Sequence, residues 1–373
     1  MMKLLSTIKR NTVSKTYVKK WKNILIDITV ILLLPVPIML LSCTKKVEVP
    51  DASARQCPES ARLSALPDDN KKKIVNYPLV DSVRYLNRLG LQDIGDLKEA
   101  AEPVVVTATS ANHIALATGL IDRLSANMTP KLKIVVFDVG MTEDQRKKIC
   151  EGGKCVLKQF PFDLYPDFLE NYLPSHAWKP VVIQMALQEF GFVIWMDSAV
   201  YIPDGNLQGG IDIARREGIA AGHKLLGNPD VNLAYETNTR TFKALGEEPC
   251  AFKNTFRFNA ALIFIKRNAF TYKYIMRPWV SCALTKTCID ADSTFYSKCA
   301  FANKYGFCHR FDQSVLSIIL NRLYYLHTDK IDLKNKVKWT KCYIKQELAN
   351  FNEMVFIKNE QNGIQCPQPE TVK

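Results

Sequence analysis

The sequence predicts an α/β protein with a mixed, mostly parallel sheet that is covered by helices on both faces. From residue 103 onward, short apolar runs of strand length alternate with helix-like segments, and this alternation is typical of a parallel sheet. The run 192–196 is apolar throughout, which indicates a strand buried on both faces. Asp197 follows it directly, and open α/β sheets bind ligands beyond the carboxyl ends of such strands. We therefore expect the functional site at this strand end.

The expected elements follow one another along the chain. A run of valines begins the domain, and each later strand is a short apolar run. Pro180 is expected at the first position of the helix before the central strand, where proline is favoured. Arg310-Phe311-Asp312-Gln313 opens the last helix. The expected strands are 104–107, 134–137, 155–160, 192–196 and 257–265, and the expected helices are 114–124, 142–149, 180–190 and 310–323.

The start of the chain has the pattern of a membrane anchor. The first 22 residues carry seven basic side chains and no acidic one, and residues 24–44 contain no lysine or arginine. As a helix this stretch is roughly 31 Å long, close to the ~30 Å hydrocarbon core of a bilayer. We expect residues 1–22 as a cytosolic tail and 23–44 as one transmembrane signal anchor, with the rest lumenal. A cleaved signal peptide and a lipoprotein box at Leu40-Leu41-Ser42-Cys43 are the alternatives.

The remaining chain divides into three parts by composition. Residues 45–102 mix prolines, charges and short apolar pieces and are expected to form a stem. Residues 103–330 carry the strand and helix pattern of a lumenal domain, and residues 331–373 are a C-terminal extension. This organisation indicates a type II protein of the Golgi or endoplasmic reticulum membrane.

Cysteine content and charge agree with that compartment. Ten of the eleven cysteines follow the anchor, so we expect disulfides rather than a zinc site. Asn127-Met128-Thr129 is the single N-glycosylation sequon, with Asn127 as the acceptor. The net charge of +13 includes seven charges in the basic tail, which a membrane surface explains. We therefore expect contact with a membrane and no nucleic-acid partner.

Four polar residues stand at positions suited to chemistry. Asp197 ends the central strand and either belongs to a site or caps the next turn. Asp312 is an N-cap or first-turn acid, or it orients and deprotonates a hydroxyl group. Thr107 at a strand end contacts a ligand or satisfies a turn. Lys179 at a helix start meets a phosphate or is exposed to solvent.

Six short motifs occur in a fixed order. Together they resemble a nematode-rich family of uncharacterised glycosyltransferase-like type II membrane proteins and, more distantly, retaining sugar-nucleotide transferases of the glycogenin and galactosyltransferase type. The resemblance covers about residues 103–325 and implies a type A glycosyltransferase fold, a Rossmann-like sheet with helices on both faces. It also implies a nucleotide-sugar donor beside the first strand and the Asp197 strand. The motifs are VVVTA (104–108), VFDVGM (136–141), WKP (178–180), WMDSA (195–199), FNAA (258–261) and FDQS (311–314).

The resemblance implies roles for individual residues. Asn259 would orient the donor sugar, and Asp312 would hold or activate the acceptor hydroxyl, so these are the expected catalytic residues. Asp197 would bind the donor ribose or a metal-linked phosphate. The expected donor-binding residues are Thr107, Ala108, Asp138, Lys179, Asp197, Ser198 and Gln313.

The sequence departs from the relatives at the metal site. Relatives with proven transfer carry Asp-x-Asp, whose two carboxylates share one divalent cation that neutralises the diphosphate leaving group. Here Ala199 replaces the second acid. The expected ligands of Mn²⁺ or Mg²⁺ are therefore Asp197 and a distant residue, His327. Otherwise a lysine or arginine neutralises the leaving group without metal, or catalysis is lost.

These observations favour an enzyme that transfers a sugar from a nucleotide-sugar donor to a glycan, protein or lipid acceptor in the secretory pathway. The alternative is an inactive pseudo-glycosyltransferase that binds glycans or partner proteins in the lumen, which Ala199 favours. A Rossmann-type methyltransferase is disfavoured, because residues 107–111 after the first strand contain no Gly-x-Gly loop.

Overall fold

The computed structural model describes residues 57–79, 82–92, 97, 102–223, 232–289, 299, 304–306 and 308–342. The predicted cytosolic tail (1–22) and signal anchor (23–44) lie outside these residues, so the membrane span stays a prediction. Among the helices of the described ranges, none has both the length and the apolar character needed to cross a bilayer.

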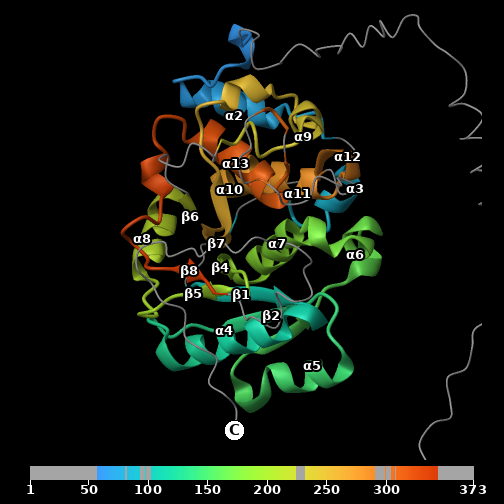
Figure 1. Cartoon of the computed structure of the whole chain (residues 1–373), viewed down its shortest axis with the longest axis vertical. Coiled ribbons are helices and arrows are strands. Elements are labelled where there is room, and N and C mark those ends of the chain that lie inside the picture. Colours follow the sequence, from blue (N-terminus) through green and yellow to red (C-terminus); the bar gives the residue numbers. More distant parts are fainter. Residues whose placement is uncertain are drawn as a thin grey trace, which may run out of the picture. The chain divides into compact units, whose positions relative to one another are not determined.

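A six-stranded sheet forms the centre of the domain (Figure 1). Its strand order is β3-β2-β1-β4-β7-β6. The β1 strand pairs in parallel with β2 and β4, and β2 pairs in parallel with β3. Only β7 is reversed, because it runs antiparallel to both β4 and β6. The predicted mixed, mostly parallel sheet is confirmed. The strands are β1 (Val104–Thr109), β2 (Ile134–Asp138), β3 (Val156–Gln159), β4 (Phe192–Met196), β6 (Ile219–His223) and β7 (Phe258–Lys266).

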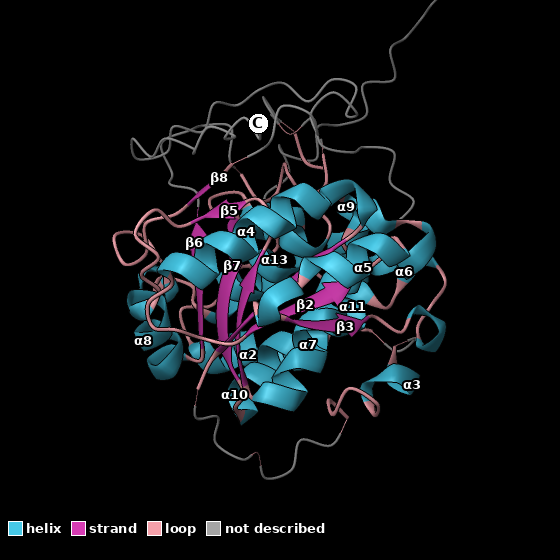
Figure 2. Ribbon diagram, turned by 90° about the horizontal axis from the view of Figure 1, so that it is seen from below, coloured by secondary structure: helices cyan, strands magenta, loops and turns pink. Residues whose placement is uncertain are grey.

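Helices cover both faces of the sheet, also as predicted (Figure 2). One core lies between the sheet and α7, α11 and α13, and the other lies between the sheet and α4 and α8. Side chains of β4 alternate between the two cores: Val193 and Trp195 enter the first, and Ile194 and Met196 enter the second. All four are at most 1% exposed, which confirms a strand buried on both faces.

Most predicted helices are present with shifted ends. Pro180 is the third residue of α7 and not the first, because that helix already begins at Trp178. Thr142 lies just before α5 as its N-cap, where its hydroxyl accepts a hydrogen bond from the backbone N–H of Gln145. The helices are α2 (Pro67–Val75), α3 (Val83–Leu86), α4 (Ile114–Asn127), α5 (Glu143–Ile149), α6 (Phe168–Asn171), α7 (Trp178–Phe190), α8 (Gln208–Glu217), α9 (Thr239–Ala244), α10 (Ala269–Thr271), α11 (Arg277–Ala283), α12 (Lys286–Ile289) and α13 (Asp312–Leu323), with a π-helical turn at Tyr272–Met276.

Two elements beside β7 were not predicted, namely α8 and β6. Glycine disfavours both helices and strands, yet α8 contains Gly210 and β6 contains Gly222. A Cβ atom at Gly210 would lie 2.5–2.7 Å from the ring of Phe264, and one at Gly222 would lie 2.7 Å from Trp339. These glycines therefore permit close packing that local propensity does not reveal.

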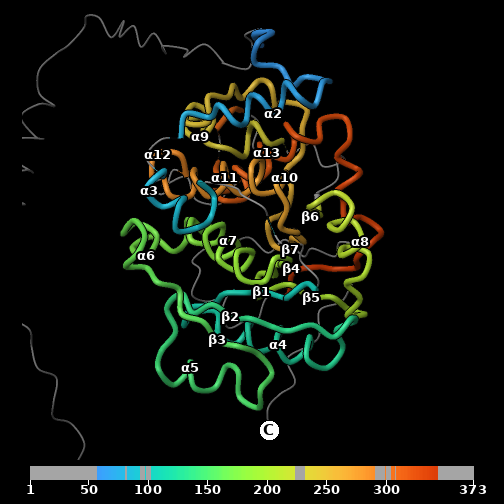
Figure 3. Tube along the Cα trace, turned by 180° about the vertical axis from the view of Figure 1, so that it is seen from behind, coloured from blue at the N-terminus to red at the C-terminus, as the bar shows by residue number. Residues whose placement is uncertain are grey.

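Part of the predicted stem packs on the domain. The α2 helix lies against α13 (Figure 3). Its Ile74 is buried in the core. The hydroxyl of Tyr77 donates to Glu247 at 2.7 Å, and Arg322 of α13 forms a buried ion pair with the same carboxylate. A disulfide also joins Cys57 to Cys250. Residues 57–79 of the segment expected as a stem thus share the packing of the domain.

The predicted disulfides are present among the described residues. Besides the Cys57–Cys250 bond, three short loops are closed, and Cys342 is disulfide-bonded as well. The short-range bonds are Cys150–Cys155, Cys282–Cys288 and Cys299–Cys308.

Candidate active site at the carboxyl end of β4

Asp197 stands directly after β4, where the sequence places the functional site. Its backbone N–H donates to the carbonyl of Ala261 in β7 at 2.8 Å, which fixes the strand end. Trp195 and Asp197 are two residues apart and point to the same face of the sheet. The indole N–H of Trp195 donates to Oδ1 of Asp197 at 2.9 Å. The aromatic ring therefore belongs to the core and also orients the carboxylate.

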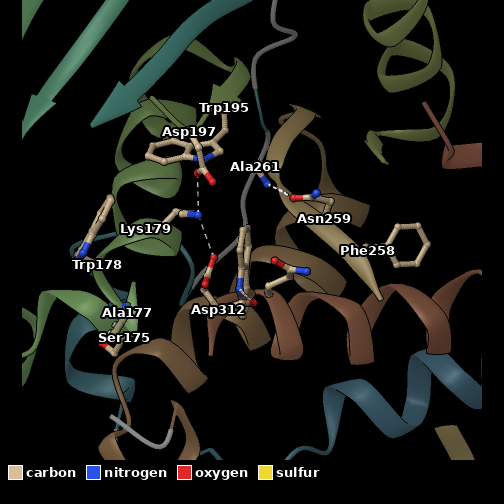
Figure 4. Close-up of polar contacts among 12 residues, drawn as sticks. Ser175, Ala177, Trp178, Lys179, Trp195, Asp197, Phe258, Asn259, Ala261 and Asp312 are labelled. Atoms are coloured by element: carbon tan, nitrogen blue, oxygen red, sulfur yellow. Dashed lines mark hydrogen bonds and ion pairs between the residues drawn. The ribbon is translucent and has the colours of Figure 1, made fainter. Parts of the chain in front are cut away.

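Lys179 connects two carboxylates from different elements. It lies in the first turn of α7, and its Nζ is 2.9 Å from Oδ1 of Asp197 and 3.3 Å from Oδ2 of Asp312 (Figure 4). Its ammonium group also lies 5.5 Å from the ring centroid of Trp195. The side chain is only 6% exposed, so the expectation of a solvent-exposed lysine is wrong. Burial arises because α7 docks on the sheet with this residue facing the end of β4.

Asp312 is the first residue of α13, which agrees with its prediction as a first-turn acid. The preceding Phe311 has φ 44°, a left-handed value that is uncommon for a residue with a side chain. The indole N–H of Trp279 donates to the backbone carbonyl of Asp312 at 2.9 Å. Burial raises the pKa of Asp312 to about 6, and Lys179 offsets only part of that rise.

Lys341 completes the cluster, and no local pattern in the sequence predicts it there. It lies in the C-terminal segment, in the short strand β8 (Thr340–Lys341), which pairs antiparallel with β5 (Val200–Tyr201). Its Nζ is 3.0 Å from Oδ2 of Asp197. The β5 strand begins three residues after Asp197, so the two-stranded pairing holds Lys341 beside the strand end.

The two lysines decide the ionisation of Asp197. Burial alone would raise the pKa of this carboxyl group, but the ammonium groups of Lys179 and Lys341 outweigh it and hold the pKa well below its usual range. Asp197 is therefore a carboxylate at any physiological pH. Each of its two oxygens faces one ammonium group.

Asn259 lies on β7 next to this cluster. Its Oδ1 accepts a hydrogen bond from the backbone N–H of Ala261 at 2.9 Å, while the carbonyl of Ala261 accepts the N–H of Asp197. The side-chain amide nitrogen of Asn259 points away from Ala261 (Figure 4). The strand thus fixes the orientation of the amide group.

Other predicted donor-binding residues have structural roles or lie in the core. Thr107 is 0% exposed, and its hydroxyl has no hydrogen-bond partner among the described residues. Oδ1 of Asp138 accepts the backbone N–H groups of Gly140 and Met141, and Oδ2 is paired with Arg146. These contacts give Asp138 the role of shaping the loop after β2.

The remaining predicted residues are distributed around the site. Ala108 is buried near the end of β1, and Ser198 is half-buried directly after Asp197. Gln313 is half-buried in the first turn of α13, beside Asp312. Asn127, the predicted glycosylation site, is the exposed last residue of α4.

The residues present do not fit a divalent cation at Asp197. His327 is exposed and lies beyond the C-terminal end of α13, whereas Asp312 is at the start of that helix, about 18 Å of helix away. Nowhere in the described ranges do three His, Cys, Asp or Glu side chains gather as metal ligands would. Both oxygens of Asp197 already face ammonium groups. The predicted metal pair Asp197 and His327 is therefore not brought together.

Two histidines near the cluster were not predicted as site residues. His176 adopts a left-handed backbone conformation with φ 52° two residues before α7. Burial lowers its pKa to about 3, and the positive charge of Lys179 acts in the same direction. Burial also lowers the pKa of His113, against an opposing attraction to Asp197. Both rings are neutral at pH 7, so they add no charge to the cluster.

A protein-family model matches part of this chain. Residues 79–184 match the model of a family described as a protein of unknown function, DUF1647. The matched region includes Lys179 and ends before Asp197. Among curated proteins, none matches this chain.

Solved structures similar to this chain are glycosyltransferases. The bifunctional glycosyltransferase WbbM is 15% identical, with a TM-score of 0.37 over 62% of this chain and 39% of the WbbM chain, so this chain spans well under half of that protein. The galactosyltransferase LgtC, in complex with donor and acceptor sugar analogs, is 16% identical with a TM-score of 0.33 over 60% of this chain and 70% of LgtC. The mannosyltransferase Ktr4p from S. cerevisiae, in complex with GDP, is 12% identical with a TM-score of 0.35 over 68% of this chain and 80% of Ktr4p. The predicted nematode-rich and type II character of the family stays a prediction.

Proposed function

We propose that this protein transfers a sugar from a nucleotide-sugar donor to a hydroxyl group of a glycan, protein or lipid. The observation that carries the proposal is the convergence of Lys179, Asp197 and Lys341 at the carboxyl edge of the parallel strands. Ligands of open α/β sheets bind at this edge. The ordered motifs of the sequence, which resemble those of glycosyltransferases, support the same reaction.

The reaction makes three demands that these side chains can meet. The diphosphate leaving group needs positive charge, which lysine supplies. The donor sugar needs a fixed hydrogen-bond donor, which the amide nitrogen of Asn259 supplies. The ribose hydroxyls need an acceptor, which the ionised and 23% exposed carboxylate of Asp197 supplies.

We propose a role for Asp312 that differs from the one that the resemblance implies. Its side chain is only 3% exposed and is paired with Lys179, which argues against direct contact with an acceptor hydroxyl. We assign it to holding the ammonium group of Lys179 in position. The acceptor would then approach from the side of Asn259 and Lys341.

The proposed setting is the lumen of the secretory pathway, with residues 23–44 as the anchor of a type II membrane protein. Disulfides at several places in the described domain support an oxidising compartment. The basic bias of residues 1–22 supports a cytosolic amino terminus.

The test is turnover of nucleotide sugars by the full-length protein, followed by mass spectrometry of the released nucleotide. We expect at least one donor to be consumed, and we expect Asp197→Asn to lower the rate by about tenfold or more, since it removes the charge but keeps the shape. Lys154→Gln is the matched control, because it removes a half-exposed ion pair, that of Lys154 with Asp122, which is not part of the cluster around Asp197. Binding of donors without turnover would favour the pseudo-glycosyltransferase. A folded wild type that binds no nucleotide sugar would contradict both.

A further inference from the structure

The position at which Asp-x-Asp proteins hold a cation has a different composition in this chain. The second acid is replaced by Ala199, which is 6% exposed and offers no side-chain oxygen. Its backbone carbonyl instead accepts the N–H of Cys342 at 2.8 Å. Cys342 follows Lys341 directly, so a backbone hydrogen bond joins Ala199 to the segment that carries this lysine.

The ammonium groups of this site also oppose a metal ion. Lys179 and Lys341 lie 2.9 Å and 3.0 Å from the two oxygens of Asp197. A divalent cation bound to the same carboxylate at about 2.1 Å would lie within about 5 Å of an ammonium group, and like charges at that distance repel strongly in a partly buried site. The positive charge that a donor diphosphate requires is thus already present as lysine.

The two lysines differ in their access to solvent. Lys179 is 6% exposed and is held between Asp197 and Asp312, whereas Lys341 is 25% exposed. An ammonium group on a partly exposed side chain is a charged donor suited to a phosphate oxygen. Lys341 is therefore the more accessible lysine for a ligand at the strand end, whereas the buried Lys179 holds Asp197 in place.

We propose that Lys341 binds the diphosphate of the nucleotide sugar in the place where relatives use a divalent cation, so that this site takes its donor without metal. The inference rests on the proposed function and adds the chemistry of the leaving group. Asp197 orients Lys341 and receives the ribose hydroxyls, and the short β5–β8 pairing sets the position of the ammonium group. The short strand β8 (Thr340–Lys341) is then part of the binding site.

Calorimetric titration of the full-length protein with UDP, GDP and ADP, in EDTA and then in Mn²⁺, tests this inference. We expect at least one of these nucleotides to bind in EDTA, with a Kd that Mn²⁺ changes by less than about threefold. Lys341→Gln should weaken binding by about tenfold or more, as expected for loss of a charge-assisted contact to phosphate. Lys341→Arg keeps the charge and should retain most of the affinity. Lys338→Gln is the matched control, since Lys338 is an exposed lysine three residues earlier.

Folding of each variant is checked by thermal unfolding, and Asp197 keeps its contact with Lys179 when Lys341 is replaced. Binding that requires Mn²⁺ would overturn the metal-free site while leaving the proposed transfer reaction in place. Unchanged affinity of a folded Lys341→Gln variant would overturn the role of this lysine. Absence of binding in both buffers would overturn the inference together with the proposed function.

Discussion

Lys341 lies 3.0 Å from Oδ2 of Asp197, although 144 residues separate the two in sequence. The contact joins the C-terminal segment to the end of the central strand. Lys179 contacts the other carboxylate oxygen, so Asp197 lies at the centre of a cluster of lysines and carboxylates. This arrangement is the reason to assign anion binding, and not metal binding, to the site.

Replacement of Lys179 should destabilise the protein strongly. Lys179→Met leaves Asp312 buried without its cation and removes one of the two lysines at Asp197. Loss of one partner of a buried ion pair costs about 3–5 kcal/mol, which urea unfolding at neutral pH would measure. The exposed pair of Lys154 and Asp122 provides the comparison, and Lys154→Gln should cost less than about 1 kcal/mol. If the two variants lost the same unfolding free energy, the central position of Lys179 would be contradicted.

Asp312 should give the stability a recognisable pH dependence. Its pKa is about 6 in the folded protein against 3.8 for an ordinary aspartate, so between these values the folded state holds a proton that the unfolded state has lost. The contribution of this group to stability therefore falls as pH rises from about 4 to about 6, by roughly 3 kcal/mol in total. Asp312→Asn has no such titration.

The measurement for Asp312 is urea unfolding of wild type and Asp312→Asn across that pH range. His176 and His309, whose pKa values are lowered by burial to about 3 and about 4, act in the opposite direction in both proteins. The difference between wild type and variant isolates Asp312. If the difference stays constant with pH, Asp312 titrates normally and the assigned burial of its carboxyl group is wrong.

Much of the fold is predictable from the sequence, because its strands are apolar runs and its helices are periodic. The run 192–196 shows why: with no polar residue in it, a strand buried on both faces is the simplest arrangement, and the structure has it. Composition predicts a stem for residues 45–102, which include 57–79, because prolines, charges and short apolar pieces are mixed there. Its attachment depends on Arg322 and Glu247, which are distant in sequence and give no local signal.

The candidate site is only half predictable for the same physical reason. Asp197 is visible as the acid at the end of an apolar strand, and Lys179 and Asp312 stand at the starts of predicted helices. Burial of Lys179 between the two carboxylates depends on how α7 and α13 dock. Lys341 lies on a strand of two residues, too short to show any periodicity, so its contact could be found only in three dimensions.

The long-range disulfide should matter more than a short one. The Cys57–Cys250 bond joins residues with a sequence separation of 193, whereas the sequence separation across the Cys150–Cys155 bond is 5. In the chain-entropy account these bonds stabilise by about 5 and about 2 kcal/mol, respectively. We expect Cys57→Ser with Cys250→Ser to lower the melting temperature more than Cys150→Ser with Cys155→Ser.

Hydrogen exchange locates the effect of that disulfide. Loss of the Cys57–Cys250 bond should raise the exchange of amides in α2, because this segment is then tied to the domain by the hydrogen bond of Arg322 to Asn70 in α2 and that of Tyr77, just after α2, to Glu247. Unchanged exchange in α2, or a larger effect from the Cys150–Cys155 pair, would contradict the assigned attachment of this segment.

The proposed donor site is tested most directly by an experimental structure of the full-length protein with a bound nucleotide sugar that turns over or binds in the assays above. We expect the diphosphate at the carboxyl ends of β1 and β4, with a phosphate oxygen within about 3 Å of Nζ of Lys341 and no metal ion at Asp197. A donor bound elsewhere, or a divalent cation between Asp197 and the diphosphate with Lys341 turned away, would contradict it.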